Sequence, residues 1–389
     1  MTVLHHRIDG AGSALPLILG PSLGTTLSVW EAQAPALARG RRVIRYDLPG
    51  HGGSPAELLP ADATVGDLAG LVLALADQLG IDRFAYAGIS LGGAVGSWLA
   101  VHHPDRVAAL VLVATSARFG EPGPWRERAH LVRTEGMAPV ARTAPGRWFT
   151  PAFVADPAAQ ALLADLRATD ATAYATICDA LASFDLRAEL PRITAPTLVL
   201  AGREDRATPV EDTRLLADGI AGASLTEVAH AAHLVPVERP APVLAALRSY
   251  LDSRVETRAT TVPDDDGSRY ASGIAVRRAV LGDAHVDRAI ARTTEFTSEF
   301  QDFITRYGWG EVWTRPGLSR ATRRCMTLTA MIANGHQEEF ALHIRAALRD
   351  GITPAEIQEV LLQSAVYCGV PAANTAFTIA NRIMEENAH

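Results

Sequence analysis

One serine stands where a serine can act as a nucleophile. Residues 84–93 read FAYAGISLGG, so Ser90 has a glycine two positions before it and another two positions after it. A short apolar run precedes this motif and a helical segment follows it. In the strained turn between such elements, side chains at the two glycine positions would clash. The pattern predicts that the Ser90 hydroxyl stands above the carboxyl edge of a sheet, as in a nucleophile elbow.

A serine hydroxyl attacks well only when a histidine takes its proton and an acid orients that histidine. In folds with this turn, the acid and then the histidine follow the serine along the chain. Asp205 lies where a predicted strand breaks into a loop, and it is the preferred acid. Asp185 and Glu204 are the alternatives.

Two histidines follow the next predicted strand, His230 and His233. His233 is favoured as the base because the stretch from it to Pro240, with Glu238 five residues on, is the usual lead into a last helix. His230 is then a surface or packing residue. The sequence therefore predicts a Ser90, Asp205 and His233 triad.

Backbone N–H groups must stabilise the oxyanion that forms when the serine attacks. One donor comes from the residue after the nucleophile, which is Leu91, and the second comes from a loop after an early strand. The turn at residues 21–24, Pro-Ser-Leu-Gly, lies in such a loop, so Leu23 is the second predicted donor.

The first 250 residues alternate short β-branched runs with amphipathic helical stretches, which is typical of an α/β fold with a mostly parallel sheet. Leu68, Val72, Leu75 and Leu79 recur at helical spacing and predict one clear helix. Between about residues 118 and 190 the alternation stops, and a stretch rich in Ala, Arg and Trp predicts a helical cap over the sheet. The predicted strands cover residues 15–19, 42–46, 84–87, 109–113, 197–200 and 224–228.

The chain changes character after residue 252. Residues 253–268 are polar and turn-rich and are predicted to be a linker between a domain at 1–252 and an all-α domain at 269–389. In the second domain, Thr353 as N-cap, Pro354 at the first helical position and Glu356 in the first turn mark a helix start. Gly351 closes the helix before it.

One histidine of this second domain is a candidate for proton transfer. Residues 335–351, GHQEEFALHIRAALRDG, predict a helix on which His343 shares an apolar face with Phe340. Glu339 precedes His343 by one turn and can hydrogen-bond it. Such a histidine is more often a core residue, but here it can also be a proton donor or acceptor held by Glu339.

Composition excludes several kinds of chemistry and of partner. All 36 basic residues are arginine, so the chain has no lysine for a pyridoxal phosphate aldimine, a Schiff base or a P-loop. The net charge of −7 argues against nucleic acid. Cys178, Cys325 and Cys368 form no CxxC pair or metal cluster, which fits a reducing cytoplasm, and no apolar run is long enough to span a membrane.

The first 251 residues resemble the α/β-hydrolase family and, more narrowly, the 3-oxoadipate enol-lactonases. The resemblance rests on GPSLGTTLSVW, RYDLPGHGGS, AGISLGG and the RWFTPAF of the cap. It implies hydrolysis of an enol-lactone through an acyl-serine. A serine nucleophile argues against the haloalkane dehalogenases and epoxide hydrolases of this fold, which use aspartate. Trp148, Arg133 and Arg147 of the cap are candidates to meet a substrate carboxylate.

Residues 270–386 resemble 4-carboxymuconolactone decarboxylase, with EEFALHIRAALRDGITPAEIQEVLLQSAVYCGVPAAN among the matching segments. The CxxC pair of the related alkylhydroperoxidases is missing. The resemblance implies a decarboxylation in which the lactone itself accepts the electrons, without a cofactor or metal. His343 is then the expected acid, oriented by Glu339, and Arg324 or Arg345 the anion binder. Glu311, Trp309 and Tyr367 are weaker candidates.

The two resemblances together imply a bifunctional, cytoplasmic enzyme of the protocatechuate branch of the 3-oxoadipate pathway. It would decarboxylate 4-carboxymuconolactone and then hydrolyse the enol-lactone, with small lactone carboxylates as substrates. A homo-oligomer built through residues 270–386 is expected, because the decarboxylases form rings. Alternatives are another serine esterase or carbon–carbon hydrolase with a helical oligomerisation domain, or a ligand-binding pseudoenzyme.

Overall fold

The computed structural model describes residues 3–255, 266–315 and 318–386. The chain divides into two compact units, Met1–Leu251 and Asp252–His389. Helix α11 (Pro240–Val255) and helix α12 (Asp266–Leu281) take up both ends of the segment predicted as a linker, and its middle, residues 256–265, lies outside the described residues.

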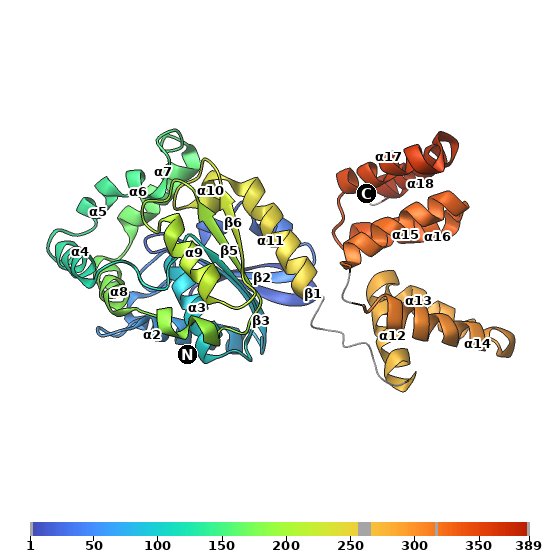
Figure 1. Ribbon diagram of the computed structural model, residues 1–389, viewed down its shortest axis with the longest axis horizontal. Helices are drawn as coiled ribbons and strands as arrows, with labels where there is room; N and C mark the ends of the chain where they lie inside the picture. The colour runs from blue at the N-terminus through green and yellow to red at the C-terminus, as the bar shows by residue number, and fades with distance from the viewer. Residues whose placement is uncertain (1–2, 256–265, 316–317, 387–389) are drawn as a thin grey trace. The chain divides into compact units, whose positions relative to one another are not determined.

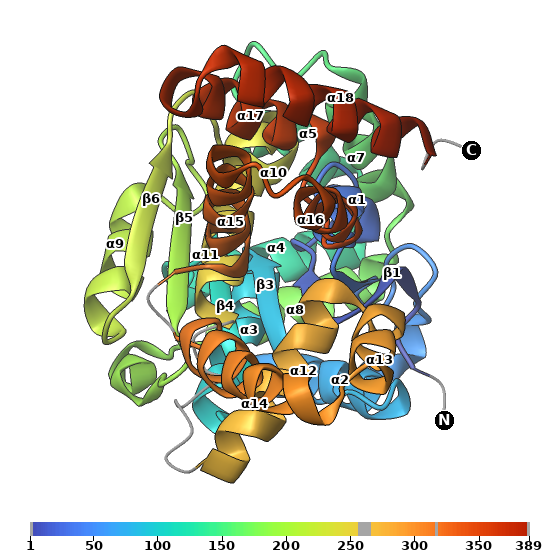
Figure 2. The same cartoon turned by 90° about the vertical axis from the view of Figure 1, so that its right-hand side faces the viewer.

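The first unit is built on a six-stranded sheet with the order β2-β1-β3-β4-β5-β6. Only β1 and β2 pair antiparallel, and the other neighbours are parallel, which confirms the predicted fold class. Figure 2 shows β5 and β6 at one side of the sheet with α9 (Val210–Gly219) against them. All six predicted strands are present: β1 His6–Gly20, β2 Arg41–Tyr46, β3 Phe84–Ile89, β4 Val107–Val113, β5 Thr197–Gly202 and β6 Ser224–Val228.

Strands β3 and β4 lie in the middle of the sheet. Every residue of β3 is buried, as expected of a parallel strand that is covered on both faces. Helix α3 (Leu91–His102) follows β3 directly and packs against β3 and β4. Helix α2 (Val65–Gln78) is the helix predicted from leucine spacing, and it begins at a capping box formed by Thr64 and Asp67.

A helical insertion between β4 and β5 forms the cap, which Figure 1 shows grouped beside the sheet. Its members are α4 Pro122–Glu135, α5 Ala138–Thr143, α6 Pro145–Trp148, α7 Pro157–Ala168, α8 Ala171–Ser183 and the short helix η3 Arg187–Arg192. Shorter elements complete the first unit: η1 Leu27–Trp30, α1 Ala34–Leu37, η2 Ala56–Leu58 and α10 Val235–Glu238.

The described part of the second unit consists of helices and the turns that connect them, without a strand. Gly273 of α12 and Gly310 of the π-helix η5 allow close backbone contact, since a Cβ on Gly273 would lie 2.0 Å from the Thr305 carbonyl oxygen. Helix α17 begins at the predicted Thr353 and Glu356 capping box. Besides α12, the helices are α13 Asp283–Ala291, α14 Glu295–Phe303, η5 Ile304–Val312, α15 Arg320–Asn334, α16 Gln337–Arg349, α17 Pro354–Cys368 and α18 Val370–Glu386.

Over the described ranges, no helix is both long and apolar enough to cross a membrane.

Candidate active sites

Ser90 occupies the strained turn that its neighbouring glycines predict. It lies between β3 and α3 with φ +53° and ψ −115°, which is a costly backbone conformation for a residue with a side chain. A Cβ on Gly88 would lie 2.2 Å from the Gly92 carbonyl oxygen, and one on Gly92 would lie 2.6 Å from that of Gly20. The two glycines are therefore required sterically, and they leave the serine exposed to a cavity rather than to the core.

His233 and Asp205 form a buried pair on the loops after β6 and β5. His233 Nδ1 lies 2.8 Å from Asp205 Oδ2. The carboxylate also accepts hydrogen bonds from the Thr208 hydroxyl and from the backbone N–H groups of Ala207 and Thr208, at 2.8, 2.7 and 3.1 Å. Burial alone would raise the pKa of Asp205, but the imidazole and these hydrogen bonds together hold it below its usual value.

The alternative triad residues lie apart from this pair. Asp185 forms an ion pair with Arg187 at 2.6 Å, and Glu204 lies 3.8 Å from the exposed His230. Of the acids weighed from the sequence, only Asp205 contacts His233 among the described residues.

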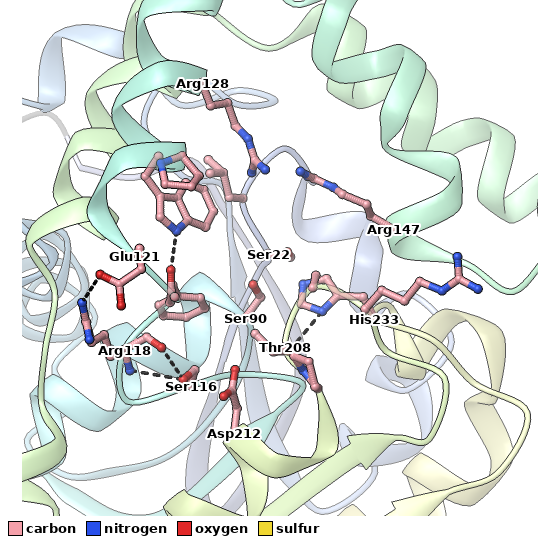
Figure 3. Close-up of a pocket in the computed structure, with 18 of the residues that line it drawn as sticks. Ser22, Ser90, Ser116, Arg118, Glu121, Arg128, Arg147, Thr208, Asp212 and His233 are labelled. Carbon is pink, nitrogen blue, oxygen red and sulfur yellow. Dashed lines mark hydrogen bonds and ion pairs between the residues drawn. The ribbon is translucent and has the colours of Figure 1, made fainter.

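Ser90 and His233 both line a cavity of about 490 Å³ beneath the cap. Figure 3 shows the Ser90 side chain pointing toward the His233 ring. Leu23 and its neighbour Ser22 line the same cavity, while Asp205 lies behind the imidazole, away from it. The geometry suits a nucleophile and its base at the floor of a substrate pocket.

The loop that carries Leu23 is held by a histidine that the sequence did not single out, His51. The Gly24 N–H donates to His51 Nε2 at 3.0 Å, and His51 Nδ1 lies 2.9 Å from the Pro49 carbonyl oxygen. Because a carbonyl can only accept, Nδ1 carries the proton and Nε2 is left as the acceptor for Gly24. Burial lowers the pKa of His51 to about 4, so the ring is neutral at neutral pH.

The first predicted oxyanion donor, Leu91, is the first residue of α3. Its N–H has no acceptor within the helix, as for any first-turn residue, and it adjoins Ser90. The signal for His51 was present in the motif RYDLPGHGGS, but only the fold brings that motif to the loop at Leu23.

Four arginines of the cap region line the pocket, and two of them, Arg118 and Arg187, form ion pairs with Glu121 and Asp185. The other two are Arg147 and Arg128. The Arg147 Nε is buried without a hydrogen-bond partner among the described residues, and burial and the neighbouring Arg128 lower the pKa of Arg147. Arg128 lies over the Trp125 ring, 4.4 Å from its centroid. Trp148, the third cap residue suggested as a substrate contact, also lines the pocket.

Arg133 is not part of this pocket, contrary to the expectation for the cap arginines. Its guanidinium forms an ion pair with Asp179 at 2.6 Å, which ties α4 to α8. Arg128 lies on the same helix and takes the place in the pocket that the sequence suggested for Arg133.

Glu238 links the cap to the loop that carries His233. Its buried carboxylate accepts hydrogen bonds from the Ala232 N–H at 2.9 Å, the Thr150 N–H at 3.1 Å and the Thr150 hydroxyl. Ala232 immediately precedes His233, and Thr150 follows the last turn of α6. One carboxylate therefore holds both the residue before the base and the segment that follows α6 of the cap.

In the second unit, His343 is buried on α16 beside Phe340 and Ile344. Its pKa is lowered to about 4, first by burial and then by Arg324 and His285, with Glu339 acting in the opposite sense. His343 is therefore neutral at neutral pH.

The predicted hydrogen bond from the His343 ring to the Glu339 carboxylate is not formed. Glu339 is exposed in the first turn of α16, and His343 Nδ1 has no partner within the described part of the chain. The spacing of one turn brings the two side chains near enough for electrostatic influence only, because the carboxylate extends into solvent.

The two predicted anion-binding arginines differ in position. Arg324 is buried on α15, donates to the Asp350 carboxylate, and leaves its Nη1 without a partner among the described residues. Arg345 lies on an exposed part of α16 and forms an ion pair with Glu386 at 2.6 Å, so it stands outside the site. Arg277 of α12, which the sequence did not suggest, is buried and lowers the pKa of His285.

The weaker candidates of this unit have other contacts. Trp309 stacks on Trp313 with 5.0 Å between ring centroids, Glu311 lies 3.9 Å from Arg269, and Tyr367 is 77% exposed. Over residues 3–255, 266–315 and 318–386, no group of three or more His, Cys, Asp or Glu is arranged to hold a metal ion.

The two units match two families. Residues 16–133 match the family described as alpha/beta hydrolase fold, and residues 298–382 match the carboxymuconolactone decarboxylase family. The chain belongs to the alpha/beta hydrolase family through its first unit and to the carboxymuconolactone decarboxylase family through its second.

Particular relatives narrow these classes. The chain is 40% identical over 239 residues to 3-oxoadipate enol-lactonase 2 of Acinetobacter baylyi, covering 61% of this chain and 88% of that protein. It is also 40% identical over 122 residues to 4-carboxymuconolactone decarboxylase of the same organism, covering 31% of this chain and 91% of that protein. The crystal structure of the enol-lactonase from Burkholderia xenovorans superposes with a TM-score of 0.61 at 40% identity, covering 64% of this chain and 96% of that one. The predicted fusion of two such enzymes is confirmed.

Proposed function

We propose that this chain catalyses two successive reactions: decarboxylation of 4-carboxymuconolactone in the second unit and hydrolysis of the resulting 3-oxoadipate enol-lactone in the first. The observation that carries this proposal is the presence, in one polypeptide, of near full-length matches to an enzyme named for each step. The decarboxylation product is the lactonase substrate, so each match supports the particular substrate that the other match implies.

In the first unit, His233 removes the Ser90 proton as the serine oxygen attacks the lactone carbonyl carbon. Asp205 holds the imidazole by Nδ1, which leaves Nε2 free to act as the base. The backbone N–H groups of Leu23 and Leu91 stabilise the oxyanion.

The ring C–O bond then breaks, and His233 gives its proton to the enol oxygen, which becomes a ketone. Water, activated by His233, releases the acyl group from Ser90 as 3-oxoadipate. Arg147 and Arg128 bind the free carboxylate of the lactone, a role supported by their place in the pocket and by the unpaired Arg147 Nε.

In the second unit, loss of carbon dioxide from the ring carbon sends the bonding electrons through the ring double bond to the lactone carbonyl oxygen. The site must hold carboxylates, stabilise this dienolate and deliver a proton to carbon. His343 is the proposed acid and Arg324 an anion binder. Glu339 acts on His343 only through its charge.

We further propose that the enzyme works in the cytoplasm as a homo-oligomer assembled through the second unit. The three free cysteines fit a reducing compartment. Large exposed apolar side chains of the second unit support assembly, among them Phe296, Val366, Tyr367 and Val370.

Two variants test the division of labour. With 4-carboxymuconolactone as substrate, Ser90→Ala is expected to release carbon dioxide and accumulate the enol-lactone, whereas His343→Ala is expected to release none but to hydrolyse supplied enol-lactone. Manometry and the ultraviolet absorbance of the lactone follow the two steps separately. A wild-type protein that hydrolyses other esters but neither intermediate would favour an unrelated serine hydrolase, and one that binds both without turnover would favour a pseudoenzyme.

A further inference from the structure

Three buried nitrogen atoms of the second unit have no hydrogen-bond partner among the described residues: Arg277 Nε, Arg324 Nη1 and His343 Nδ1. All three side chains are more than nine-tenths buried. A buried polar group without a partner is costly, and native proteins rarely leave one without a reason. Three such atoms in one unit point to a site for a ligand that accepts hydrogen bonds.

The helices that carry these side chains pack together. Arg324 of α15 reaches the Val280 carbonyl oxygen of α12 at 3.5 Å, one turn beyond Arg277. Val280 shares a hydrophobic cluster with Val286 of α13 and Leu342 of α16, and these flank His285 and His343 in the sequence. The helices α12, α13, α15 and α16 thus bring the two arginines and two histidines into one region of the unit.

The region carries an excess of positive charge. Asp350 neutralises Arg324 in part, but the hydrogen-bond partners of Arg277 among the described residues are the neutral side chains of Gln301 and Thr305. Besides burial, which is the largest cause, Arg277 lowers the pKa of His285, and Arg324 and His285 lower that of His343, so the four groups influence one another. Only the exposed Glu339 acts on His343 in the opposite sense among the groups that shift its pKa within the described residues. A ligand that relieved this imbalance would be an anion.

We infer that Arg277, Arg324 and His285 bind the substrate of this unit as a dianion, and that the arriving dianion makes His343 take up the proton that it later donates. The inference rests on the proposed decarboxylation and adds the residues and the source of the proton. His343 is neutral without substrate, and a neutral imidazole is a poor acid. Two carboxylates close to it favour its protonated form and offset the effects of burial, Arg324 and His285.

The proton balance of the reaction agrees with proton uptake by His343 on substrate binding and proton donation after decarboxylation. The dianionic lactone loses neutral carbon dioxide, and its electron pair passes through the ring double bond to the carbonyl oxygen. The resulting dienolate keeps both negative charges until His343 transfers its proton to the ring carbon next to the carbonyl. The product is a monoanion and His343 is neutral again, so each turnover consumes one proton, which enters when the next dianion binds.

Calorimetry can test proton uptake with unreactive probes. Homocitrate γ-lactone carries both carboxylates but lacks the ring double bond, and 3-hydroxyadipate γ-lactone also lacks the ring carboxylate. Full-length Ser90→Ala avoids lactone hydrolysis, and titrations at pH 7 in two buffers of different ionisation enthalpy give the protons taken up. We expect about one proton per dianion bound and none per monoanion.

Variants assign the effect to named residues on the same Ser90→Ala background. Adding His343→Gln should leave dianion binding but abolish its proton uptake. Adding Arg277→Met should weaken dianion binding by about tenfold or more and monoanion binding much less, with partial rescue by Arg277→Lys. Arg345→Met, an exposed arginine of the same unit, is the matched control and should change neither. Binding in the first unit contributes equally to every variant and cancels in the comparison.

The outcomes separate this inference from the proposed function. If the wild type releases no carbon dioxide from 4-carboxymuconolactone, the proposed decarboxylation is wrong. If it does, but proton uptake persists in His343→Gln, or Arg277→Met turns over with the kcat and KM of Arg345→Met, then the dianion site is wrong while the decarboxylation stands. Thermal unfolding of each variant establishes that it is folded.

Discussion

Replacing Glu238 with glutamine should loosen the cap of the first unit without releasing the catalytic histidine. Glu238 accepts from the N–H groups of Ala232 and Thr150 and from the Thr150 hydroxyl. Glutamine has one oxygen and one NH2 group where glutamate has two oxygens. The hydroxyl of Thr150 can turn from donor to acceptor, but a backbone N–H cannot. The amide therefore keeps its oxygen toward Ala232 and turns its NH2 toward Thr150.

One buried backbone N–H, that of Thr150, then loses its acceptor. This costs about 1–3 kcal/mol of unfolding free energy. For a unit of about 250 residues it corresponds to a Tm lower by roughly 2–12 °C. Because Ala232 keeps its bond, His233 stays in position, and KM for the enol-lactone should rise more than kcat falls. Glu238→Ala removes the acceptor for Ala232 as well as that for Thr150, so His233 also loses its support and kcat should fall as well.

Differential scanning calorimetry and steady-state hydrolysis of the enol-lactone provide the measurements, and carbon dioxide release from 4-carboxymuconolactone should be unchanged. Glu204→Gln is the matched control, because Glu204 is an exposed glutamate of the same region. The reasoning would be refuted if Glu238→Gln kept the wild-type Tm within about 1 °C, or if Glu238→Ala kept the wild-type kcat.

Three further changes in the first unit test separate contacts. Asp205→Asn should lower kcat for lactone hydrolysis about 10³- to 10⁴-fold with little change in KM, since the imidazole loses its orienting acceptor; equal kcat values would contradict the triad. The pKa of His51 is about 4 in the folded protein against 6.5 when unfolded, so as the pH falls the unfolded chain takes up this proton first. Between pH 6.5 and pH 4 the free energy of unfolding of the first unit should therefore fall by roughly 3 kcal/mol through this group. Urea titrations at several pH values should show that His51→Phe lacks this part of the pH dependence. Arg147→Met should raise KM roughly 10- to 100-fold, whereas Arg133→Met, which removes only an exposed ion pair, should not; similar KM values for both variants would exclude Arg147 from carboxylate binding.

The nucleophile turn could be predicted because its pattern lies in one short stretch of sequence. Gly88 is required by a contact with Gly92 inside this strand, turn and helix, whereas Gly92 is required by the Gly20 carbonyl of β1, which only the fold brings near. Asp205 and His233 could be proposed because each follows a recognisable strand in a known order. Their mutual contact at 2.8 Å depends on the sheet order, which brings β5 and β6 side by side.

His51 and Arg128 could not be selected from the sequence for the opposite reason. His51 lies in a turn far along the chain from Gly24, and its role appears only when β1 and β2 pair. The cap offers several arginines on neighbouring helices. Whether Arg128 or Arg133 faces the pocket depends on the rotation of α4 against α8, which the polar surface of that helix does not reveal.

In the second unit, helical spacing identified the buried face but not its polar contacts. His343 is buried, as its apolar neighbours suggested. Glu339 and Arg345 lie one turn before it and two residues after it, yet both extend into solvent. Arg277 comes from another helix entirely, so no local pattern could relate it to His343.

Because the chain has no lysine, both proposed sites must use arginine as the cation that binds a carboxylate. Each needs a cation beside a carboxylate in a place where burial removes water, and burial favours the neutral form of any base. A lysine so buried readily gives up its proton, whereas an arginine stays charged and offers two parallel N–H groups to a carboxylate. Burial lowers the pKa of Arg147 and of Arg277 from the ordinary arginine value, which is high enough to leave them charged at neutral pH. Arginine can therefore serve a monoanion in one unit and a dianion in the other, and the two substrates differ by the one negative charge that protonation removes after carbon dioxide has left.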